Sequence, residues 1–125
     1  MMNKAQSINP EAIENLRSLS PNDDDEFLKE ILTIFLTDTP LRIADLHKFL
    51  AGGNVEAFTR TAHTIKGSSS HVGATEIHDL SEKIEKNSRL NGLAFHENQL
   101  NELAEAFDRA KVIIEKNLLS DRAYK

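Results

Sequence analysis

Apolar residues recur at helical spacing along almost the whole chain, and nowhere do they alternate as they would in a half-buried β-strand. The broadest such stripe consists of Phe27, Leu28, Ile31, Leu32, Phe35 and Leu36. Prolines and glycines separate the stripes, as is typical of helix ends. A chain of 125 residues with 39% apolar content suits one domain with one core. We therefore predict an all-α fold, an antiparallel four-helix bundle with a short N-terminal extra helix.

The helix boundaries follow from capping residues and breakers. Asn9 and Pro10 indicate a short first helix that ends near Leu19, within an N-terminal cap segment 1–20 of a single domain 1–125. The helical bundle is expected to fill residues 21–120, with helices at roughly Asp24–Leu50, Asn54–Val72, Ala74–Leu90 and Ala94–Leu119.

Two features of the first bundle helix call for a specific interpretation. Asp38-Thr39-Pro40 predicts a break and a restart, because proline fits the first turn of a helix better than its interior. The restarted helix would carry the apolar residues Leu41, Ile43, Leu46, Phe49 and Leu50. The acidic run Asp23-Asp24-Asp25-Glu26 suits the positive end of a helix dipole. A metal site is disfavoured there because no loop of oxygen ligands follows.

Composition excludes several classes of function. The chain has no cysteine, so disulfides, thiol catalysis and thiolate metal sites are absent. A formal net charge of −5 without a basic stripe argues against nucleic acid as a partner. The first residues carry no apolar signal region, and no run approaches the ~18 apolar residues of a membrane span. We expect a cytoplasmic protein with no membrane partner, and Met1-Met2 without a linker favours a free-standing one.

The predicted helix 54–72 has two different faces. One face is small or apolar and should point into the core; it consists of Phe58, Ala62, Ile65, Ser69 and Val72. The opposite face carries His63, Lys66, Gly67 and Ser70 at spacings i, i+3, i+4 and i+7. A nucleophilic imidazole one turn from a cation suits a site where an anion sits on the ring. Gly67 costs roughly 1 kcal/mol relative to alanine inside a helix, so another molecule is expected to approach the backbone there.

The run His63-Thr64-Ile65-Lys66-Gly67-Ser68-Ser69, followed by Gly73-Ala74, resembles the signature of histidine-containing phosphotransfer (HPt) domains of His–Asp phosphorelays. The resemblance covers about residues 21 to 115. It implies that His63 accepts a phosphoryl group from a receiver-domain aspartate and passes it to another receiver aspartate. Lys66 would neutralise phosphate oxygens, and Gly67 would clear space for the partner. In this family the phosphoryl group goes on Nε2, but the sequence alone does not choose between the ring nitrogens.

The resemblance also implies the partners and the supporting residues. Response-regulator receiver domains and a hybrid sensor histidine kinase would be the partners of a monomer. No cofactor is expected in the chain itself, because Mg²⁺ would belong to the receiver. Glu85 falls at the family position that reaches from the next helix toward the histidine, although a solvated acid on a polar face is an equal alternative. Ser70 is a candidate for contact with phosphate or partner, whereas Ser69 is expected to pack inward and bond the i−4 carbonyl.

Other readings remain open at this point. The chain carries no ATP-binding glycine loop and no receiver pattern of aspartate and lysine, so no ATP-dependent kinase activity is expected. Alternatives are an HPt-fold binding adaptor or a receiver phosphatase without a stable carrier role. A hydrolase using His63 as base is disfavoured because no second nucleophile accompanies it. His47, His71, His78 and His96 show no pairing typical of a helical-bundle metal site, and we predict no metal.

Overall fold

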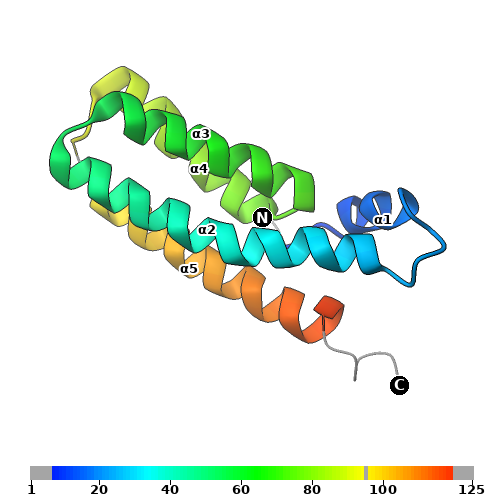
Figure 1. The fold of residues 1–125 in the computed structure, drawn as a ribbon. Coiled ribbons are helices and arrows are strands. Elements are labelled where there is room, and N and C mark those ends of the chain that lie inside the picture. Colours follow the sequence, from blue (N-terminus) through cyan, green and yellow to red (C-terminus); the bar gives the residue numbers. More distant parts are fainter. Residues whose placement is uncertain (1–6, 95, 120–125) are drawn as a thin grey trace, which may run out of the picture.

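The computed structural model describes residues 7–94 and 96–119, and over these ranges every regular element is a helix. Their bounds are α1 Pro10–Ser18, α2 Glu26–Gly52, α3 Val55–Val72, α4 Thr75–Asn91 and α5 Glu97–Ile114, followed by one π-helical turn, Glu115–Leu119. Short loops at alternating ends make α2, α3, α4 and α5 antiparallel neighbours in an elongated bundle, and α1 lies at one end of it (Figure 1). The predicted all-α four-helix bundle with a short N-terminal helix is confirmed.

The core lies between the apolar stripes of the four long helices. Phe35 of α2 and Phe107 of α5 meet with their ring centroids 6.2 Å apart. The largest fully buried apolar side chains are Leu28, Leu32, Leu46, Phe58, Ile65, Ile77, Ile84, Leu100, Leu103 and Ile114. Their spacing along each helix is the spacing seen in the sequence, so helical periodicity predicted the buried faces correctly.

Helix α2 is continuous across Pro40, so the predicted break at Asp38-Thr39-Pro40 is wrong. The buried stripe of α2 runs through the proline without a change of register, because Thr39 and Ile43 are both buried. Pro40 itself is exposed. Packing of the whole stripe therefore outweighs the single backbone hydrogen bond that proline removes. In this continuous register Leu41 points to solvent and is 61% exposed, unlike Ile43 and Leu46, which are buried.

Two aspartates of the acidic run before α2 make specific contacts, one with the start of α2 and one with α1. The helix begins at Glu26 rather than Asp24, since Asp24 and Asp25 have φ values of 57° and 67°. Asp23 accepts a hydrogen bond from the Phe27 amide at 3.1 Å, which satisfies one of the amides left free at a helix start. Arg17 of α1 binds the Asp25 carboxylate at 2.9 Å. The run therefore both caps α2 and holds α1.

The last helix starts at Glu97, three residues later than predicted, because a buried histidine sets the boundary. His96 is 1% exposed and its ring lies 4.8 Å from the Phe58 ring. Its Nε2 lies 2.8 Å from the Gly92 carbonyl oxygen, and its Nδ1 lies 2.9 Å from Gln99 Oε1. These contacts fix the α4–α5 turn, and no sequence period signals them.

Helix α1 is fastened to the corner between α3 and α4. The Asn9 side chain caps α1 by accepting from the Glu11 amide at 3.0 Å, as predicted. The backbone N–H of Asn9 in turn donates to the Gly73 carbonyl oxygen at 2.7 Å. Gly73 has φ 75°, and a Cβ added there would lie 2.6 Å from Ala12 Cβ. Glycine is needed at this corner both for its backbone conformation and for the approach of α1.

No helix within the described ranges is both long enough and apolar enough to cross a bilayer.

The Gly73 corner gives a paired prediction. Gly53 also has a positive φ, 71°, but a Cβ added there meets nothing within 4 Å. Gly53→Ala should therefore cost only the left-handed backbone penalty, about 1–2 kcal/mol. Gly73→Ala should cost about 1–3 kcal/mol more, because it also overpacks against α1. Urea unfolding at pH 7 measures both, and equal midpoints for the two variants would contradict the α1 contact.

Candidate functional site

Helix α3 presents the two faces that its sequence predicts. The face formed by Phe58, Ala62, Ile65, Ser69 and Val72 is buried, with no side chain more than 2% exposed. Ser69 Oγ donates to the Ile65 carbonyl four residues earlier, as expected of a small inward-facing serine. On the opposite face, His63, Gly67 and Ser70 are exposed, and Lys66 is partly covered. The exposed face of α3 therefore carries the imidazole that the sequence predicts to be the nucleophile.

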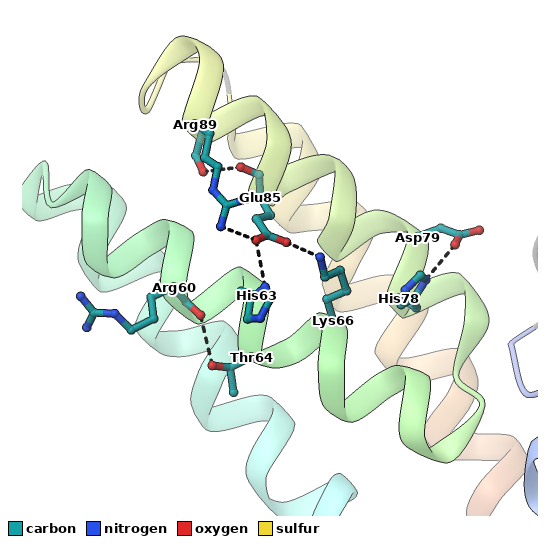
Figure 2. A network of polar contacts seen from close by, with 9 residues as sticks. Arg60, His63, Thr64, Lys66, His78, Asp79, Glu85 and Arg89 are labelled. Carbon is teal, nitrogen blue, oxygen red and sulfur yellow. Dashed lines mark hydrogen bonds and ion pairs between the residues drawn. The ribbon is translucent and has the colours of Figure 1, made fainter.

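His63 is held from behind by a carboxylate of the neighbouring helix. The His63 side chain is 60% exposed, yet its Nδ1 lies 2.9 Å from Glu85 Oε2 of α4. Figure 2 shows the ring and the Lys66 chain rising from α3 toward Glu85. The side chain of Glu85 is only 2% exposed, so the alternative of a solvated acid on a polar face is excluded.

Glu85 is bound by three cationic or proton-donating side chains. Lys66 Nζ lies 2.7 Å from Oε1, and Arg89 Nη2 lies 2.7 Å from Oε2, the same oxygen that contacts His63. Burial by itself would raise the pKa of Glu85. The contacts to Lys66 and His63 and the charges of Lys66 and Arg89 act the other way and together hold the pKa below its ordinary value. The carboxylate is therefore ionised at neutral pH.

An ionised carboxylate fixes the state of the imidazole. It can only accept hydrogen bonds, so the proton between the two groups must be carried by His63 Nδ1. In the neutral ring Nε2 then bears the lone pair, and it lies on the side of the ring away from Glu85. In a neutral His63 the contact therefore favours Nε2 as the nitrogen with the free lone pair, a choice that the sequence left open.

Gly67 leaves open space beside the ring. A Cβ added at Gly67 would meet nothing within 4 Å, so neither crowding nor an unusual backbone conformation requires glycine there. Ser70 lies one turn further along the same exposed face. The helix thus offers bare backbone next to His63, which fits the predicted close approach of another molecule.

A shallow hollow of about 470 Å³ adjoins the other side of His63. Arg60 of α3 and Arg89 of α4 line it, together with Thr59 and Ser88, whose hydroxyl oxygens lie 2.6 Å apart. Sequence reasoning missed Arg89. Its spacing of four residues from Glu85 on one helix was a usable signal, because such pairs share a face.

The other histidines do not gather into a ligand cluster. His78 pairs with its neighbour Asp79 at 3.0 Å, and His96 is buried at the α4–α5 turn. Among the residues placed by the structure, no group of three His, Asp or Glu side chains could hold a metal ion.

Two comparisons with known proteins connect this geometry to phosphorelay proteins. The chain is 29% identical over 80 residues to multistep phosphorelay regulator 1 of Schizosaccharomyces pombe, a stretch that is 64% of this chain and 27% of that protein. The chain thus spans about a quarter of the length of this curated relative. Its fold matches the crystal structure of histidine-containing phosphotransfer protein B (HptB) from Pseudomonas aeruginosa PAO1 with a TM-score of 0.82, at 23% identity, over 91% of this chain and 96% of that one.

A family model gives the assignment. The model described as "Hpt domain" matches residues 30–112. This range includes all of α3 and α4 and most of α2 and α5, and therefore every side chain that contacts Glu85. The chain belongs to the Hpt domain family.

Proposed function

We propose that this protein is a histidine phosphocarrier of a two-component phosphorelay. His63 accepts a phosphoryl group from a receiver-domain aspartate and passes it to another receiver aspartate. Membership of the Hpt family supports the general role. The observation that supports the assignment to His63 is the contact of its Nδ1 with buried Glu85, because in a neutral ring this contact leaves the lone pair on Nε2 of a side chain that is 60% exposed.

The forward step is a direct transfer. The Nε2 lone pair of His63 forms the N–P bond while the bond between phosphorus and the aspartate oxygen breaks, and its electron pair leaves with that carboxylate. The ring then carries both the Nδ1 proton and the phosphoryl group, so positive charge develops on it. Glu85, 2.9 Å from Nδ1, stabilises that charge. The return step reverses these bond changes on a second aspartate.

Lys66 acts on the incoming phosphoryl group, and Gly67 makes room for the receiver domain that brings it. The Lys66 ammonium neutralises phosphate oxygens during transfer and in the phosphorylated state. Gly67 admits the receiver's loops to the backbone beside His63, and Ser70 adds a hydroxyl on the same face. Mg²⁺ comes with the receiver, and the protein needs no cofactor of its own.

The protein acts as an intermediate and not as an ATP-dependent kinase. Its partners are receiver domains of response regulators and of a hybrid sensor histidine kinase, which it meets as a monomer in the cytoplasm. The exposed position of His63 supports this role, because a carrier must present one face to successive partners.

The first prediction concerns His63. A phosphorylated receiver domain should transfer label to the wild-type protein as an acid-labile, base-stable adduct, and His63→Gln should take up none. Circular dichroism and urea unfolding check that the variant is folded. Wild type that stays unlabelled while the receiver loses phosphate faster would indicate a phosphatase. Neither label nor loss with several receivers would indicate a binding adaptor.

The second prediction separates access from folding at Gly67. Gly67→Gln should keep or raise stability, because glutamine is a better helix former than glycine by up to about 1 kcal/mol and the site is open. Transfer from a phosphorylated receiver should nevertheless fall about a hundredfold, because the longer side chain displaces the partner from His63. Gly67→Ala, with a smaller side chain, should lose less. Wild-type transfer by Gly67→Gln would remove the access role.

The third prediction uses the charge of Glu85. Because its folded-state pKa lies below the ordinary value of 4.5, its contribution to stability is present above pH 4.5 and is lost as pH falls through the folded-state value. Glu85→Gln should cost about 1.5–3 kcal/mol at pH 7, the range for hydrogen bonds to charged groups. That deficit should shrink steadily below pH 4.5, as measured by urea unfolding between pH 7 and pH 3.

Transfer to His63 should fall about 10–100-fold in Glu85→Gln at pH 7, because an amide does not stabilise the ring charge. Glu102→Gln, which changes an exposed acid on α5, is the matched control and should change neither quantity. A pH-independent stability deficit in Glu85→Gln would contradict the ionised carboxylate.

A further inference from the structure

Lys66 already has a partner before any phosphoryl group arrives. Its ammonium lies 2.7 Å from Glu85 Oε1, and its side chain is only 25% exposed. A phosphoryl group on His63 Nε2 would sit on the outer side of the ring, away from Glu85. If the proposed function holds, a Lys66 ammonium that turns outward to the phosphate oxygens would loosen its pair with Glu85.

When that pair loosens, the buried Glu85 carboxylate loses one of its counter-ions. The carboxylate is only 2% exposed while Lys66 is paired with it, so it has little contact with water to compensate for a departing ammonium. A buried charge without a counter-ion is strongly unfavourable, and a carboxyl group escapes that state by taking up a proton. A protonated Glu85 would no longer stabilise positive charge on the imidazole at the moment when the N–P bond forms.

We infer that Arg89 is a positioning residue which keeps Glu85 ionised and directed at His63 Nδ1 while Lys66 moves from the carboxylate to the phosphoryl group. The guanidinium lies 2.7 Å from Glu85 Oε2 and approaches from α4, so it does not depend on the movement of Lys66 on α3. Arginine stays charged at any pH that the fold tolerates.

The two oxygens of the Glu85 carboxylate have different partners. Oε1 contacts Lys66, whereas Oε2 contacts both His63 and Arg89. Departure of Lys66 therefore empties one oxygen and leaves the hydrogen-bonded edge intact. Figure 2 shows Arg89 reaching along α4 to Glu85, while the Arg60 side chain extends away from it.

The simpler interpretation is an ordinary i,i+4 ion pair on a helix surface, since Arg89 is 61% exposed. Such pairs contribute little when both partners are solvated. Here the acidic partner, Glu85, is removed from water and also bonds the His63 imidazole. A pair between Arg89 and Glu85 therefore affects the ring as well. The two interpretations differ in what happens once Lys66 is taken away.

The test removes Lys66 by mutation and follows Glu85 directly. The carboxyl titration of Glu85 is measured by ¹³C NMR in Lys66→Ala, in Lys66→Ala/Arg89→Ala and in the control Lys66→Ala/Lys86→Ala, which removes an exposed cation of the same helix. With Arg89 present, the measured pKa of Glu85 should stay at or below 4.5. Without both cations it should rise well above that value. An unchanged titration on loss of Arg89 would overturn the inference, and this readout requires no phosphotransfer.

A second measurement connects the pair to the reaction. Arg89→Ala should slow transfer from a phosphorylated receiver about tenfold at unchanged fold, Arg89→Lys should restore part of the rate, and Lys86→Ala should match wild type. Wild-type transfer by Arg89→Ala would overturn the inference and leave the carrier role standing. An unlabelled wild type would overturn the carrier role, and the titration alone would then decide whether Arg89 holds Glu85.

Discussion

The arrangement of the site depends on one buried charge, the Glu85 carboxylate between α3 and α4. It receives His63 and Lys66 from one helix and Arg89 from the other, so a single side chain sets the positions of three. A buried ion pair usually adds less stability than an apolar side chain of similar size would. Its place in this bundle is better explained by what it does to the imidazole, since it selects the proton-bearing nitrogen and orients the ring.

Small side chains make this contact possible. Helices α3 and α4 share the most extensive interface of the bundle, and Ser69, Ser81 and Ser88 on them are at most 1% exposed. Thr59 and Ser88 meet across the interface at 2.6 Å. Small residues let two helix axes approach closely, and at that separation a glutamate on one helix spans the gap to the next. The small residues packed between α3 and α4 therefore also determine which side chains can meet at the exposed face.

The sequence predicted what depends on local period and missed what depends on neighbours in space. The two faces of α3 followed from spacing alone, because a helix converts sequence separation directly into direction. The Pro40 break was wrong because a local preference was given more weight than a stripe that continues through Ile43. The start of α5 was misplaced because His96 is fixed by Gly92 and Phe58, and no periodic signal encodes those contacts.

Glu85 illustrates the same limit at the site. The family resemblance placed it near His63, but only the fold shows that its side chain is buried and that Arg89 shares one of its oxygens. Burial of a charged group can be read only once the neighbouring helix is in place. Local pattern and the family resemblance singled out His63, and the tertiary structure shows which side chains surround it.

The orientation of the Glu85 carboxylate also bears on how a phosphoryl group on His63 could be hydrolysed. Glu85 contacts the ring at Nδ1, so it lies behind the imidazole relative to a phosphoryl group on Nε2. From there it cannot draw a proton from a water molecule that attacks phosphorus, because general-base catalysis requires hydrogen-bonding distance. In the proposed carrier, the carboxylate that orients the histidine would therefore not speed up hydrolysis of the phosphoryl group that the histidine holds.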